Sequence, residues 1–136
     1  APAFFDESSL EESMGRLIND FSIGEELEID CVVSEQVHAI ELGHDLQLNL
    51  YRILQEQLKN ILRHSSANRV DISLECNDQS IQMMVKDDGI GFDANQTFRG
   101  IGLSNIYERV RFYDGTADIQ TAAGEGCRLI VTIPLL

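Results

Sequence analysis

Two periods of apolar residues alternate along the chain, and they predict which segments are helices and which are strands. Apolar residues recur at every third or fourth position in three segments, which is the period of an amphipathic helix. These segments are residues 9–24, 46–65 and 103–113. The first begins with a capping-box pattern, in which Ser8 or Ser9 precedes Glu11 and Glu12. The second has a broad apolar face that includes Leu62, so we expect it to be a core helix.

Five further segments have apolar residues at every second position, the period of a half-buried strand. They are residues 27–33, 70–76, 81–87, 117–121 and 127–135. The polar segment 77–80 predicts a hairpin turn, and the polar segment 34–45 is predicted to turn the chain. The order of these elements favours an α+β fold. We expect a two-layer α/β sandwich, with three main helices on one face of a mixed, mostly antiparallel sheet of about five strands.

The composition is that of one globular domain spanning residues 1–136. Hydrophobic residues make up 43% of the chain, and no apolar run approaches the length that a bilayer requires. The net charge of −13 argues against a nucleic-acid partner, because phosphate groups need a basic surface. Residues 1–50 carry twelve acids and one base, whereas residues 51–136 carry eleven acids and nine bases. We therefore expect any anion to bind to the second part of the chain.

The cysteines and the amino-terminal residues indicate the kind of cellular compartment in which the protein is found. Cys31, Cys76 and Cys127 lie in segments of apolar alternation and have no metal-ligand spacing. This pattern predicts buried thiols in a reducing compartment. The first residues lack the basic start and long apolar stretch of a signal peptide, and they are typical of a cut inside a longer protein.

Two pairs of glycines lie close together, in Asp87-Asp88-Gly89-Ile90-Gly91 and in Gly100-Ile101-Gly102-Leu103. Glycine weakens regular structure, so paired glycines indicate places where the backbone turns sharply or where a ligand approaches it. The second pair opens the third helix, and the amino-terminal end of a helix favours an anion. The sequence therefore predicts a binding site here.

One edge of the core helix carries four polar side chains, Glu56, Asn60, Arg63 and His64, at spacings of four, three and one. An amide oxygen together with phosphate oxygens can hold magnesium, and a guanidinium can meet phosphate charge. Glu56, one turn before Asn60, could orient or deprotonate an attacking group. His64 has two interpretations, a group of the nucleotide site or a polar residue that interacts with the helix dipole.

These segments together resemble the ATP-binding catalytic domain of two-component sensor histidine kinases. Residues 50–64 resemble its E-x-x-x-N box, and the two glycine pairs resemble its two glycine boxes in the same order and spacing. The sequence Leu-Tyr-Arg-Ile before Glu56 and the short segment between the glycine boxes are most similar to those of the nitrate-sensor type of these kinases. The resemblance implies the Bergerat ATP-binding fold, with ATP and Mg²⁺ as cofactors.

The resemblance also implies a role for each site residue. Asp87 would accept a hydrogen bond from the adenine amino group, Asn60 would bind Mg²⁺, and Arg63 would contact phosphate. Glu56 would be the catalytic acid next to the transferring phosphate. Gly89, Gly91, Gly100 and Gly102 would form the floor and hinges of a lid over the nucleotide, residues 92–99, whose only base is Arg99, and Leu103 would follow the lid. The last box departs from the family, because Cys127 stands where Thr or Ser is usual.

As function, the resemblance implies transfer of the γ-phosphoryl of Mg-ATP to a histidine on a separate helical dimerisation domain, and from there to an aspartate of a response regulator. No segment of this chain fits that helical domain, and the segment His44-Asp45 is interpreted as a surface loop. The parent protein would be a homodimer, cytoplasmic or anchored in the inner membrane, and the isolated domain a monomer. Two alternatives stay open, a regulatory nucleotide-binding module without catalysis and a serine kinase of the anti-sigma-factor type.

Overall fold

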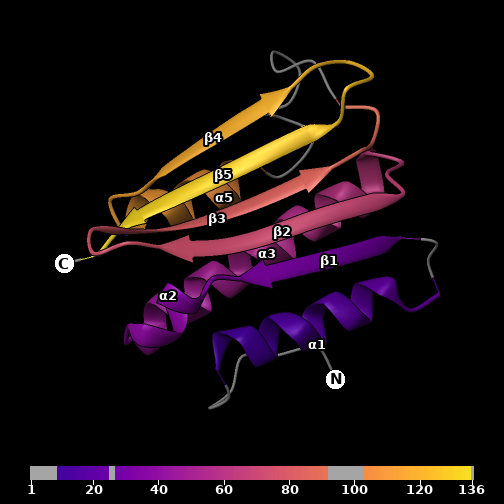
Figure 1. The fold of residues 1–136 in the computed structure, drawn as a ribbon. Helices are drawn as coiled ribbons and strands as arrows, with labels where there is room; N and C mark the ends of the chain where they lie inside the picture. The colour runs from indigo at the N-terminus through magenta and orange to yellow at the C-terminus, as the bar shows by residue number, and fades with distance from the viewer. Residues whose placement is uncertain (1–8, 25–26, 92–102, 136) are drawn as a thin grey trace.

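The computed structural model describes residues 9–24, 27–91 and 103–135, which form an α+β fold (Figure 1). The polar segment 34–45 contains a short helix, and the other elements follow the predicted order. In chain order the elements are α1 (Leu10–Ser22), β1 (Glu28–Val33), α2 (Glu35–Ala39), α3 (His44–His64), β2 (Arg69–Cys76), β3 (Ser80–Asp87), α5 (Leu103–Phe112), β4 (Thr116–Thr121) and β5 (Cys127–Pro134).

The five strands form one sheet in the order β1-β2-β3-β5-β4. β1 pairs in parallel with β2, and the other three pairs are antiparallel. The parallel pair is possible because α2 and α3 form the crossover between its strands. α3 packs on β3, and α5 packs on β4 and β5, so these two helices cover one face of the sheet, while α1 packs beside β1 (Figure 1). The predicted mixed, mostly antiparallel sheet is confirmed.

The core lies between this face of the sheet and α3. Along β3 and β5 every second side chain is fully buried, and these residues are Ile81, Met83, Val85, Leu129, Val131 and Ile133. They pack on the buried stripe of α3, which includes Leu50, Leu54, Leu58 and Ile61. Because α3 runs the length of the sheet, this packing fixes where its last turn lies against the end of β3.

The start of α1 has the predicted cap. The backbone amide of Glu12 donates to Oγ of Ser9 at 3.2 Å, and the Ser9 hydroxyl donates to Oε1 of Glu12 at 3.3 Å. Ser9 is therefore the N-cap, which the pattern had left open between two serines.

Three expectations were wrong in detail. The segment 34–45 is not only a turn, because it contains α2 and the first residues of α3, including His44. A helix of five residues is too short to leave a periodic signal. Leu62 is 45% exposed, since it lies about 100° around the helix from Ile61 and turns away from the sheet. Cys31 is exposed because β1 is the outermost strand and the helices cover it incompletely.

Candidate functional site

A small cavity lies where the last turns of α3 meet the end of β3. It has a volume of about 20 Å³, which is room for about one water molecule. The residues that line it come from four separate parts of the chain. They are Gln57, Asn60, Ile61, His64 and Ser65 of α3 and its end, Asp87 and Gly91 at the first glycine box, Leu103 at the start of α5, and Cys127 at the start of β5. The fold thus brings several of the predicted site residues together.

Asp87 is the buried acid of this cavity. It is the last residue of β3, and strand alternation turns it toward the helices, so that its side chain is only 3% exposed. Its Oδ1 accepts a hydrogen bond from the backbone amide of Gly89 at 2.9 Å. Among the described residues no donor reaches Oδ2. Because Oδ2 is not fully enclosed by protein, it can accept a hydrogen bond from a ligand at the cavity.

The environment of Asp87 raises the pKa of its carboxyl. Burial is the main cause, and the negative charge of Asp88 adds to it, while the hydrogen bond from Gly89 partly opposes the shift. Cys127 faces the same carboxylate across the β3–β5 ladder. Burial, with a contribution from the charge of Asp87, raises the pKa of the Cys127 thiol to about 12, so at neutral pH it is an uncharged, weak hydrogen-bonding group.

Asn60 is held by a neighbour that the sequence patterns did not identify. Its Nδ2 donates to Oε1 of Gln57, one helical turn earlier, at 3.4 Å, and both side chains are more than nine-tenths buried. This contact uses the amide nitrogen of Asn60 and leaves Oδ1 for a cation. Gln57 occupies a position inside the apolar stripe of α3, and a glutamine in such a position is the one signal that could have revealed it.

The donor set fits Mg²⁺ only in combination with a nucleotide. In the parts of the chain that the structure describes, no group of three or more His, Cys, Asp or Glu side chains could hold a metal ion. The oxygen of Asn60 is a hard ligand of the kind that Mg²⁺ prefers, and Mg²⁺ commonly takes its other ligands from phosphates and water. Asn60 therefore fits a metal that arrives with phosphates.

The other predicted residues of α3 differ in their placement. His64 is exposed and lines the cavity one turn after Asn60. Glu56 is half-buried and Arg63 is exposed, and neither lines this cavity, although both lie within one turn of Asn60. The predicted roles of Glu56 and Arg63 stay predictions.

The first glycine box is packed closely against two loops. A Cβ on Gly89 would lie 2.7 Å from Cβ of Ser65, and one on Gly91 would lie 2.7 Å from the carbonyl oxygen of Gly126. Gly91 also has φ = 64°, a conformation that side chains disfavour. The close neighbours are therefore backbone and side-chain atoms of this protein. The predicted lid (92–99), with Arg99, Gly100 and Gly102, lies outside the described residues.

The chain is similar to known proteins in sequence and in fold. Residues 45–136 match the family model described as histidine kinase-, DNA gyrase B-, and HSP90-like ATPase. The sensor histidine kinase ComP of Bacillus subtilis (strain 168) is 44% identical over 97 residues, which are 69% of this chain and 13% of that protein. LiaS, another sensor histidine kinase of Bacillus subtilis (strain 168), is 28% identical over 135 residues, which are 98% of this chain and 36% of that protein.

Among solved structures, the blue-light activated histidine kinase of Erythrobacter litoralis EL346 is similar, with a TM-score of 0.79 at 15% identity. The match covers 93% of this chain and 42% of that one, and at this identity it supports the fold alone. The chain spans less than half the length of each of these three proteins.

Proposed function

The chain belongs to the family of histidine kinase-, DNA gyrase B- and HSP90-like ATPases, and from this premise we propose that it binds Mg-ATP where the last turns of α3 meet the end of β3, with the base next to the small cavity at Asp87. The observation that carries the proposal is the carboxylate of Asp87, which is buried and has an unused acceptor among the described groups. This acceptor is open to a donor of a ligand, and the amino group of adenine is such a donor.

The phosphates would extend from this end toward the exposed edge of α3. Asn60 holds the metal through Oδ1, and Arg63 contacts phosphate oxygens. Mg²⁺, when bound, supplies neutralisation of the phosphate charge. Glu56, four residues before Asn60, stands as the acid next to the transferring phosphate, where it orients the attacking group. The lid, residues 92–99, would close over the nucleotide, with Gly100 and Gly102 as hinges.

We propose that in a longer parent protein this domain transfers the γ-phosphoryl of ATP to a histidine of a helical dimerisation domain, and that a response regulator receives it next. The names of ComP and LiaS as sensor histidine kinases support the proposal. The parent would be a homodimer, and residues 1–136 would form its single ATP-binding domain. No helix in the described part of the chain is both long and apolar enough to cross a membrane. We place the domain in the cytoplasm, where ATP is present and the three free cysteines stay reduced.

Calorimetry with Mg-ATP or a non-hydrolysable analogue tests the binding step. We expect the wild-type chain to bind and the Asp87→Asn variant to bind at least about tenfold more weakly, because the amide replaces a charged acceptor. The proposal is wrong if the wild-type chain shows no binding at millimolar nucleotide and Asp87→Asn behaves identically.

A second experiment separates catalysis from binding. In the full-length parent, Glu56→Gln should abolish phosphohistidine while the nucleotide affinity stays unchanged. If the parent is never phosphorylated, the regulatory-module alternative is correct. If the phosphorylated product is stable to acid, the serine-kinase alternative is correct, because phosphohistidine is acid-labile.

A further inference from the structure

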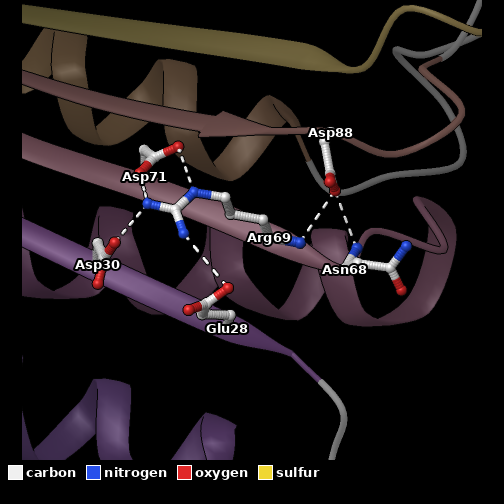
Figure 2. A network of polar contacts seen from close by, with 6 residues as sticks. All are labelled: Glu28, Asp30, Asn68, Arg69, Asp71 and Asp88. Atoms are coloured by element: carbon white, nitrogen blue, oxygen red, sulfur yellow. Dashed lines mark hydrogen bonds and ion pairs between the residues drawn. The ribbon is translucent and has the colours of Figure 1, made fainter.

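Asp88, the residue next to the buried acid, forms an unusually complete set of hydrogen bonds. Its Oδ1 accepts from two consecutive backbone amides, those of Asn68 and Arg69, each at 2.9 Å (Figure 2). Its own backbone amide donates to the carbonyl oxygen of Arg69 at 3.2 Å. The regular β2–β3 ladder ends one step earlier, at the pair of Val70 and Asp87. Asp88 therefore extends the pairing of the two strands beyond the sheet by means of its side chain.

The segment that follows β3 and the segment between α3 and β2 are joined at a second point. The backbone amide of Ile90 donates to the carbonyl oxygen of Ser65 at 2.7 Å. Ser65 caps the end of α3, and its hydroxyl donates to the carbonyl oxygen of Ile61 at 2.8 Å and accepts from the amide of Ala67 at 3.1 Å. The segment 88–90 is thus attached at both ends of residues 65–69, which comprise the connection between α3 and β2 and the first residue of β2.

This connection lies between the two halves of the proposed site. Asn60 and His64 lie on the last turns of α3, just before it, and Asp87 lies at the end of β3, just before the segment 88–90. The distance between the metal-binding and base-binding groups therefore depends on how the two loops are held. Among the described side chains, that of Asp88 is the one that joins the segment 88–90 to residues 65–69.

We propose that Asp88 is a positioning residue, which clasps the first glycine box to the α3–β2 connection and so holds Asp87 in register with Asn60. The proposal rests on the proposed nucleotide site. Asp88 itself is exposed and lies on the opposite side of the strand from Asp87, so it acts through the backbone and not by touching the ligand.

The chemistry of the side chain suits this role. A carboxylate has acceptor oxygens and no competing donor, and its hydrogen bonds from backbone amides are strengthened by its charge. These two hydrogen bonds lower the pKa of Asp88 below its ordinary value of 3.8, so the group stays ionised at neutral pH. The guanidinium of Arg69 is turned away, toward the carboxylates of the outer sheet face (Figure 2).

The test compares two substitutions at position 88 with a matched control. Asp88→Ala removes both hydrogen bonds, whereas Asp88→Asn keeps an acceptor oxygen in the same place. Asp71→Ala removes another carboxylate of the same network but leaves the clasp in place, because Asp71 contacts only the Arg69 side chain among the described groups. We expect the dissociation constant for Mg-ATP to rise about tenfold in Asp88→Ala and to stay within about twofold of wild type in the other two variants.

Hydrogen exchange provides a readout that does not depend on the nucleotide. The amides of Asn68 and Arg69 should be protected in the wild type and in Asp88→Asn, and should exchange faster in Asp88→Ala. Binding is measured at a temperature at which circular dichroism shows each variant to be folded. If the folded Asp88→Ala variant binds Mg-ATP as the wild type does, or keeps the protection of both amides, the proposed positioning role of Asp88 is wrong. Absence of binding by the wild type would instead overturn the proposed function, and the exchange measurement would still decide the clasp.

Discussion

Two polar clusters lie on opposite faces of the sheet, one on β1 and β2 and the other at the end of β3, and they differ in burial and in the number of their partners. On the outer face, the guanidinium of Arg69 contacts three carboxylates, those of Glu28, Asp30 and Asp71 (Figure 2). On the helix-covered face, the carboxylate of Asp87 is buried and has one described hydrogen bond. Exposed, fully paired charges contribute little to stability, whereas a buried acceptor with few partners costs stability. The buried cluster is therefore the one whose presence calls for a ligand.

The contrast is sharpest between the neighbours Asp87 and Asp88. Burial raises the pKa of Asp87, so its ionised form destabilises the fold at neutral pH, and this cost is relieved as the pH falls through the raised pKa. Backbone amides lower the pKa of Asp88, so its ionised form stabilises the fold above its ordinary pKa of 3.8, and this contribution is lost as the pH falls through the lowered value. Asp87 is therefore suited to binding a ligand, and Asp88 is suited to stabilising the structure.

The largest expected effect combines binding and stability in a single variant. Asp87→Asn should weaken Mg-ATP binding by about tenfold or more and should leave the unfolding midpoint equal or higher, because the buried charge is removed while the contact with the Gly89 amide is kept. Thermal denaturation at pH 7 checks the second outcome. A clearly lower midpoint would show that Asp87 has a structural role.

The pH dependence of binding should come next in size. Because adenine donates to the carboxylate, the affinity for nucleotide should fall as the pH decreases through the raised pKa of Asp87, by up to about tenfold per pH unit below it. Calorimetry between pH 7 and pH 4.5 measures this dependence. Cys127 faces the same carboxylate and stays neutral over this range, because burial raises its pKa to about 12. His64 lines the same cavity. The Asp87→Asn variant provides the control, since a pH dependence that persists in it does not come from the Asp87 carboxylate.

The sequence predicted the parts of this picture that depend on periodicity and local spacing. Alternation over residues 81–87 predicted the strand that ends in Asp87. The spacing of four polar residues predicted one polar edge of α3, and two of the four, Asn60 and His64, line the cavity. It did not predict the partners of Asp88, because a contact between residues 68 and 88 depends on the register of β2 with β3. The exposure of Cys31 likewise depends on strand order, which local patterns do not specify.

Gln57 offers a smaller effect that is specific to the metal. Gln57→Leu keeps the volume of the side chain but removes the acceptor for Nδ2 of Asn60, so Asn60 is less well oriented toward Mg²⁺. We expect the gain in nucleotide affinity on addition of Mg²⁺ to fall about threefold, with little change in metal-free binding. Gln55→Leu, the same change two positions away, is the control, because Gln55 contacts Arg52 and not Asn60. Equal losses in both variants would contradict an orienting role.

The smallest effect is expected in the outer cluster. Arg69→Gln removes the guanidinium but keeps the backbone amide that donates to Asp88, so Mg-ATP binding should stay within about twofold of wild type. The unfolding midpoint should fall slightly at low salt, because Glu28, Asp30 and Asp71 then repel one another, and the difference should shrink in about 1 M salt. Lys86→Gln, the same charge change on the neighbouring strand β3 at the position paired with Asp71, is the control. Weakening of binding beyond that of Asp88→Ala would show that the charged face, and not the backbone clasp, positions the site.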